Sequence, residues 1–130
     1  MSGELFQTLK LANGLTLEIW NLSRILAGDR WLVSLEVRIE IPVEADYLES
    51  VPEKKKVLSL IEKTFGSNVT YRYKQERYFV SQDQKQAIFV GVLDTLKKNK
   101  LAYLSHPDFA KRLVLSKYRD LKKKNPQLFL

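Results

Sequence analysis

The amino-acid sequence predicts one α+β domain over residues 1–130, an antiparallel four-stranded sheet with helices packed on one face. Two observations carry this prediction. The first half alternates apolar and polar residues between turn signals, and the second half has longer stretches whose apolar residues recur at helical spacing. With 45% hydrophobic residues the chain can form a packed core and is not expected to be disordered. The expected element order is β-β-β-(α)-β-α-α.

The first two strands are expected at residues 5–11 and 15–22, on either side of Asn13-Gly14. An Asn-Gly pair between apolar runs favours a two-residue hairpin, because a type I′ turn needs positive φ at both central positions. The segment 27–30, Ala-Gly-Asp-Arg, is expected to form a second turn that leads into the next strand.

The third strand, residues 31–43, has the clearest pattern in the chain. One face would carry Trp31, Val33, Leu35, Val37, Ile39 and Ile41. The other face would carry Leu32, Ser34, Glu36, Arg38 and Glu40. Such alternation predicts that the first face lies on the core and the second faces water. Pro42 is expected to end the strand, because proline cannot donate to a central ladder.

The following segments alternate between helix and strand patterns. Apolar residues recur at helical spacing over residues 52–65, and Gly66 would end that helix. Residues 68–80 alternate again and are rich in tyrosine, which is typical of a half-buried strand. This strand completes the expected sheet.

Two helices are predicted to close the chain. Ser81 and Gln84 fit a capping box in front of a wide apolar stripe, within which Gly91 is expected to permit close contact with the sheet. Ser105 would cap the last helix, with Pro107 at its first position. Beyond this helix lies the apolar tail 127–130, which would either dock into a partner's groove or fold back onto its own core.

Composition excludes several classes of function. The chain has no cysteine, which removes disulfides, thiolate nucleophiles and cysteine-ligated zinc. Its five glycines are scattered, so neither nucleotide-binding loop is present. No apolar run approaches the roughly 20 residues that span a bilayer, and no signal-peptide pattern is visible. We therefore expect a soluble, cytoplasmic protein without membrane insertion.

The search for catalytic groups yields little. His106 is the single histidine and is interpreted as a loop or cap residue, because no nucleophile or second ligand accompanies it. Glu18, Glu36 and Glu40 would form the cation site of a hydrolase or nuclease if they converged. The favoured interpretation is that strand carboxylates form ion pairs across the sheet with Arg38, Arg72 and Lys74. No catalytic, cofactor-binding or metal-binding residue is assigned.

The net charge of +7 is unevenly distributed. Residues 66–130 contain 14 Lys and Arg against 5 Asp and Glu, whereas residues 1–65 contain 8 against 10. A basic half indicates either a solvated helix surface or contact with something acidic. The candidate contact residues near the C-terminus are Lys97, Lys98, Lys100, Lys111, Arg112, Lys117, Arg119, Lys122, Lys123 and Lys124. A second candidate surface on the polar sheet face would combine Trp20, Arg38, Arg72, Lys74 and Tyr78.

These observations favour a non-enzymatic binding or adaptor domain whose partner is acidic or is a protein that uses the charged sheet face. The alternative is a nucleic-acid-binding protein that uses the basic C-terminal helices. No helix-turn-helix or zinc-finger frame accompanies the lysines, and glutamates on the expected sheet face would repel phosphate. The sequence therefore predicts the chemistry of the partner better than its class.

Overall fold

A computed structural model describes residues 3–129 of the chain. The elements are, in order, β1 (Glu4–Lys10), β2 (Thr16–Asn21), β3 (Arg24–Ala27), β4 (Arg30–Pro42), the 3-10 helix η1 (Ala45–Leu48), α1 (Lys54–Phe65), β5 (Asn68–Ser81), α2 (Lys85–Leu104), α3 (Phe109–Lys124) and the 3-10 helix η2 (Pro126–Phe129). The predicted α+β class and antiparallel sheet are confirmed. The apolar tail contributes backbone to η2, and the side chains of residues 128–130 lie outside the described residues.

The chain divides into two compact units, which are described separately below. The first unit comprises the residues up to Ile39 together with Tyr71–His106. The second unit comprises Glu40–Thr70 and the residues from Pro107 onward. Strands β4 and β5 thus contribute residues to both units. A single domain over residues 1–130 stays a prediction.

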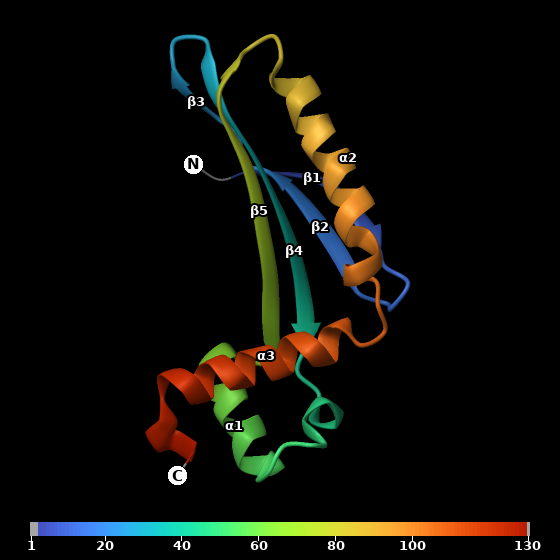
Figure 1. The fold of residues 1–130 in the computed structure, drawn as a ribbon, viewed down its shortest axis with the longest axis vertical. Helices are drawn as coiled ribbons and strands as arrows, with labels where there is room; N and C mark the ends of the chain where they lie inside the picture. Colours follow the sequence, from blue (N-terminus) through green and yellow to red (C-terminus); the bar gives the residue numbers. More distant parts are fainter. Residues whose placement is uncertain (1–2, 130) are drawn as a thin grey trace. The chain divides into compact units, whose positions relative to one another are not determined.

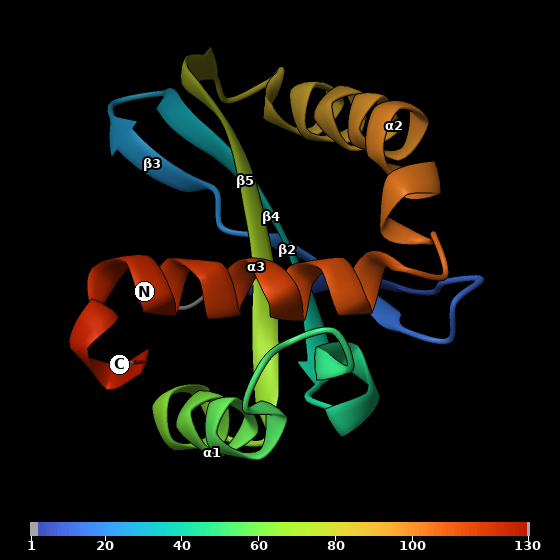
Figure 2. The ribbon, with the colours of Figure 1, turned by 60° about the horizontal axis from the view of Figure 1, so that its bottom comes forward.

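The sheet has five strands in the described chain, whereas four were expected. Its order is β1-β2-β4-β3, and β5 also pairs with β4. The strand missing from the prediction is β3, which pairs with β4 through Arg24 opposite Leu32 and Ile25 opposite Trp31. Only four residues long and largely exposed, β3 offers too few positions for an alternating pattern to be visible. In Figures 1 and 2 the β3–β4 hairpin lies at the same end of the first unit as the connection from β5 to α2.

The β1–β2 hairpin differs from the two-residue turn that Asn13-Gly14 predicts. The backbone N–H of Leu11 donates to the carbonyl of Leu15 at 2.8 Å, and Gly14 donates to the carbonyl of Leu11 at 2.9 Å. The loop therefore contains three residues, with Gly14 at φ 90° in the left-handed position that such loops require. The carboxamide oxygen of Asn13 accepts the backbone N–H of Leu15 at 3.1 Å.

The core of the first unit lies between the sheet and α2. The predicted apolar face of β4 is confirmed, because its residues in this unit after the half-exposed Trp31 are at most 1% exposed: Val33, Leu35, Val37 and Ile39. Helix α2 buries Phe89, Val92, Leu93 and Leu96. The ring of Phe89 also meets that of Phe6 from β1, edge to face, at 4.9 Å.

Gly91 does not have the role that the sequence indicated. A Cβ atom at this position would meet nothing within 4 Å beyond its own helix and chain neighbours, and the residue is exposed. The expectation that Gly91 permits close contact with the sheet is therefore wrong.

The second unit is built mainly from helices. The predicted helix over residues 52–65 is confirmed as α1, which ends at Gly66, where φ is 84°. Helix α1 buries Val57 and Ile61, and both α1 and α3 contact η1, whose Leu48 is buried. Helix α3 buries Phe109, Ala110, Val114 and Leu121 along one side. This one-sided burial decides which side chains of α3 face solvent.

The predicted serine caps are wrong. The residue before α2 is Gln84 and the residue before α3 is Asp108, and neither makes a side-chain capping hydrogen bond. Ser81 is the last residue of β5, and Ser105 follows the end of α2. None of the helices within residues 3–129 is long and apolar enough to cross a membrane.

Candidate binding surfaces

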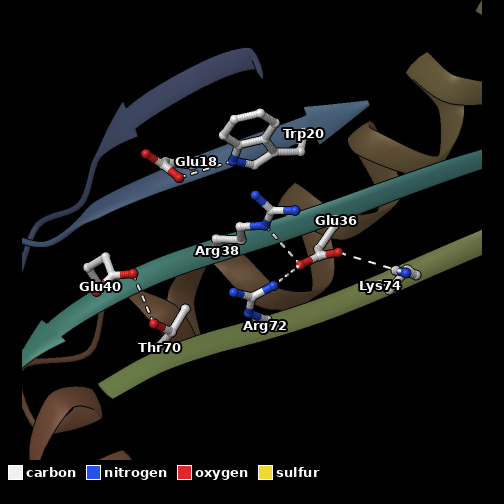
Figure 3. Close-up of polar contacts among 8 residues, drawn as sticks. All are labelled: Glu18, Trp20, Glu36, Arg38, Glu40, Thr70, Arg72 and Lys74. Carbon is white, nitrogen blue, oxygen red and sulfur yellow. Dashed lines mark hydrogen bonds and ion pairs between the residues drawn. The ribbon is translucent and has the colours of Figure 1, made fainter. Parts of the chain in front are cut away.

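The polar sheet face of the first unit is formed by alternate residues of β2, β4 and β5. Cross-strand register places Trp20 opposite Glu36, and Glu18 opposite Arg38. From β5, Arg72 and Lys74 reach toward the same carboxylate, that of Glu36 (Figure 3). The structure therefore brings together four of the five predicted sheet-face residues: Trp20, Arg38, Arg72 and Lys74.

Glu36 is the centre of this face. Its carboxylate lies 2.9 Å from Nε of Arg38, 3.5 Å from a guanidinium nitrogen of Arg72 and 3.9 Å from Nζ of Lys74. The predicted ion pairing across the sheet is thus confirmed for Glu36. The expectation that this face of β4 simply meets water is wrong at Leu32, Ser34 and Glu36, which are 5%, 1% and 5% exposed. Long side chains from the neighbouring strands reach over Glu36, as Figure 3 shows for Arg72 and Lys74.

The indole of Trp20 already has two partners on the sheet face. Its indole N–H donates to Glu18 at 3.0 Å, and the guanidinium of Arg38 lies 4.5 Å from the centre of its ring. The cation over the ring and the carboxylate at its edge hold the indole in place. An RNA platform needs aromatic rings that are open for base stacking, so this arrangement argues against one at Trp20.

Tyr78 lies further along β5 and is 61% exposed. Its hydroxyl donates to Glu76 at 3.1 Å, and this hydrogen bond is the main cause of a raised pKa for the Tyr78 phenol. The other oxygen of Glu76 accepts the hydroxyl of Ser34 at 3.1 Å. Tyr78 therefore belongs to a contact separate from the Glu36 cluster.

Charge is balanced around Glu36 on the polar sheet face, along β2, β4 and β5. Three carboxylates from Glu18, Glu36 and Glu76 accompany three cations, those of Arg38, Arg72 and Lys74. A balanced surface has no long-range attraction for a polyanion. This face is consequently a poor candidate for phosphate contacts.

The three glutamates considered for a cation site have other partners. Glu18 accepts the indole N–H of Trp20, Glu36 is held by cations, and Glu40 in the second unit accepts the Thr70 hydroxyl at 2.9 Å. Within residues 3–129 no group of three or more Asp, Glu or His side chains is arranged to hold a metal ion. The geometry does not support the nuclease or hydrolase interpretation.

The ten predicted basic contact residues are divided between the two units. Lys97, Lys98 and Lys100 lie on α2 in the first unit, where Lys97 donates to Gln7 at 3.3 Å and Lys100 stacks 4.2 Å over the ring of Tyr73. The remaining seven lie on α3 in the second unit: Lys111, Arg112, Lys117, Arg119, Lys122, Lys123 and Lys124.

Five of the seven basic residues on α3 form one surface, called here the basic face. At 3.6 residues per turn, they fall within an arc of about 120° opposite the buried side of the helix. All five are exposed, and within residues 3–129 only Arg112 of the five forms an ion pair, at 4.0 Å with Asp108. Lys117 and Lys124 lie outside this arc. The basic face consists of Lys111, Arg112, Arg119, Lys122 and Lys123.

His106 occupies an exposed loop between α2 and α3, where the sequence placed it. The side-chain amide of Asn13 donates to the carbonyl oxygens of Leu104 at 2.9 Å and His106 at 3.0 Å. Asn13 thus ties the β1–β2 hairpin to the end of α2, a role that its turn motif alone does not reveal.

Comparison with known proteins adds no relative. No protein-family model, curated protein or solved structure matches this chain. Its function is therefore inferred from the surfaces described above.

Proposed function

We propose that this chain is a non-enzymatic binding domain that holds an acidic protein segment on the basic face of α3. The observation that carries the proposal is the arrangement of charge on this helix. Five exposed cations follow one side of α3, and the opposite side is buried. Among the described residues, a single ion pair neutralises one of the five. Helix α3 carries one exposed carboxylate of its own, Asp120, so its cations remain in excess. Such an excess attracts an acidic partner over a distance of roughly 10 Å, the screening length at 0.1 M salt.

The size of the basic face matches a short peptide segment. From Lys111 to Lys123 the helix rises by about 18 Å, at 1.5 Å per residue. An extended strand covers that distance with about five or six residues. A partner helix with acidic residues on one side would fit the same surface.

Carboxylates beside α3 favour a protein segment over nucleic acid. Element η1 contacts α3 and contains the exposed Asp46, and the exposed Glu44 precedes it. A duplex or long single strand would extend past the basic face and meet these negative charges. A short acidic segment can end where the lysines end, so its contacts remain favourable.

Binding of fluorescent probes to the intact chain tests the proposal. A labelled hexaglutamate peptide, a DNA duplex and a single-stranded RNA are titrated by anisotropy at low and physiological salt. The test variant carries Lys111→Glu, Arg119→Glu and Lys122→Glu. The matched control reverses three exposed lysines elsewhere: Lys55→Glu, Lys63→Glu and Lys98→Glu.

We expect the peptide to bind the native chain at low salt and the α3 variant to bind at least about tenfold more weakly. The control variant has the same net charge, so it separates the basic face from overall charge. Equal losses in both variants would show non-specific attraction and overturn the proposal. Tighter, salt-sensitive binding of DNA or RNA that disappears in the α3 variant would establish the nucleic-acid alternative instead.

A further inference from the structure

A cavity of about 290 Å³ lies within the first unit. Its walls come from β1, the end of β2 and the residues after it, the start of β4 and the first turns of α2. Pockets for small organic ligands begin at about this volume. The residues on which its chemistry depends are Asn21, Ser23, Trp31, Lys85, Gln86 and Phe89.

Trp31 contributes an unused hydrogen-bond donor. Its indole Nε1 is buried and has no partner, the single such side-chain nitrogen or oxygen within the described chain. Leaving a buried donor unpaired is energetically costly, so such groups nearly always have a partner in a folded protein. A ligand oxygen in the cavity would supply that partner.

Lys85 contributes a cation without a carboxylate. Its Nζ lies 3.5 Å from the centre of the Trp31 ring, and Lys85 forms no ion pair among the described residues. Contact with the ring only partly replaces the water that the ammonium loses. The charge of Lys85 therefore remains available to an anion beside the indole.

Two neighbouring polar residues, Asn21 and Ser23, leave donors rather than acceptors available. The carboxamide oxygen of Asn21 accepts the backbone N–H of Ser23 at 3.0 Å, and the hydroxyl oxygen of Ser23 accepts the backbone N–H of Ser34 at 3.0 Å. What remains is the amide NH₂ of Asn21 and the hydroxyl proton of Ser23. Donors and a cation facing one space select a ligand that is rich in acceptors.

The apolar part of the cavity indicates the rest of the ligand. Phe89 is 1% exposed and is fixed edge to face against Phe6, so it forms a rigid apolar wall. Glu4 also lines the cavity but is exposed, where water screens its charge. We propose that the cavity binds a small aromatic carboxylate, with its carboxylate at Lys85 and the Trp31 indole N–H and its ring against Phe89.

Titration with phenylacetate, followed through the indole N–H signals in ¹⁵N NMR, tests this proposal. The chain has two tryptophans, Trp20 and Trp31, and Trp20→Phe assigns the two signals. We expect the Trp31 signal to shift saturably at concentrations up to about 10 mM, because the carboxylate accepts its proton. The Trp20 signal reports the polar sheet face and should stay in place. Absence of a saturable Trp31 shift overturns the proposal.

Variants identify the carboxylate contact. Lys85→Gln should weaken phenylacetate binding about tenfold, whereas Lys98→Gln, on an exposed part of the same helix, should leave it unchanged. Glu4→Gln should bind at least as tightly as the native chain, because a like charge is removed. The uncharged analogue 2-phenylethanol should bind more weakly than phenylacetate. Equal affinity for the two compounds, or equal losses in both lysine variants, would show that no carboxylate is recognised there. Native dispersion in the ¹⁵N spectrum of each variant confirms that it folds.

Discussion

The polar sheet face and the basic face of α3 use the same kinds of charged residue in opposite ways. On the sheet, Glu36 is almost buried and gathers three cations within 4 Å. On α3, one of the five exposed cations, Arg112, is ion-paired with Asp108, and the other four form no ion pair with any described residue. The first arrangement satisfies its charges internally, and the second leaves them to solvent.

We therefore expect the sheet-face charges to affect the stability of the fold and the α3 charges to affect binding. A buried carboxylate that loses its charge leaves its cations uncompensated, so the cost falls on folding. Removing the charge of a solvated lysine changes the free energy of unfolding little, and mainly weakens the long-range attraction to a charged partner. Variants at the two surfaces should therefore differ in their free energy of unfolding, with the largest change at Glu36.

Glu36→Gln should lower the free energy of unfolding by about 2–3 kcal/mol, because the amide is nearly isosteric but cannot neutralise the neighbouring arginines and lysine. Denaturant unfolding followed by tryptophan fluorescence measures this loss. Both tryptophans belong to the first unit, so this signal reports the unit that carries Glu36. Glu18→Gln is the matched control, because Glu18 accepts one indole N–H and lacks a cation cluster. If both variants lose the same free energy, the cluster around Glu36 has no special role.

The cations around Glu36 should contribute unequally. Arg38 lies 2.9 Å from the carboxylate with a quarter of its side chain exposed, and its guanidinium also covers Trp20. Arg72 lies at 3.5 Å and is 63% exposed. We expect Arg38→Gln to cost about 1–2 kcal/mol and Arg72→Gln at most about 0.5 kcal/mol. Parallel unfolding curves check this order, and the reverse order would contradict the role of burial.

Periodicity predicted most of the fold. The pattern of residues 31–43 identified strand β4 and its core face, because both faces of a regular strand repeat every two residues. The same pattern identified the polar face and its ion pairs. It did not reveal that Glu36 is nearly buried, since burial there depends on long side chains from neighbouring strands.

Features that leave no periodic pattern in the sequence could not be predicted from it. Strand β3 is too short to show a period, and positive φ at Glu53 and Phe79 follows no residue preference. The cavity beside Trp31 is lined by four separate segments of the chain, and no local motif marks them. The basic face of α3 was visible only as a list of lysines until the buried side of the helix was known.

A third prediction concerns Gly91, which lies inside α2, and it compares α2 with α3. Helix α2 has this glycine in its interior, whereas α3 contains none. Because a Cβ at Gly91 would meet nothing within 4 Å, Gly91→Ala should stabilise the first unit by about 1 kcal/mol through helix propensity alone. Thermal unfolding measures the gain. A loss of stability would restore the interpretation that this position needs the absence of a side chain.

Neutralising the basic face should have the smallest effect on folding. Lys111→Gln with Arg119→Gln removes two exposed charges that form no ion pair among the described residues, and glutamine keeps a similar helix propensity. We expect the free energy of unfolding, measured by far-UV circular dichroism, to stay within about 0.5 kcal/mol of the native value. The same variant should bind hexaglutamate more weakly and with a shallower dependence on salt. A loss as large as that of Glu36→Gln would mean that these cations support the fold, and the division between the two surfaces would then fail.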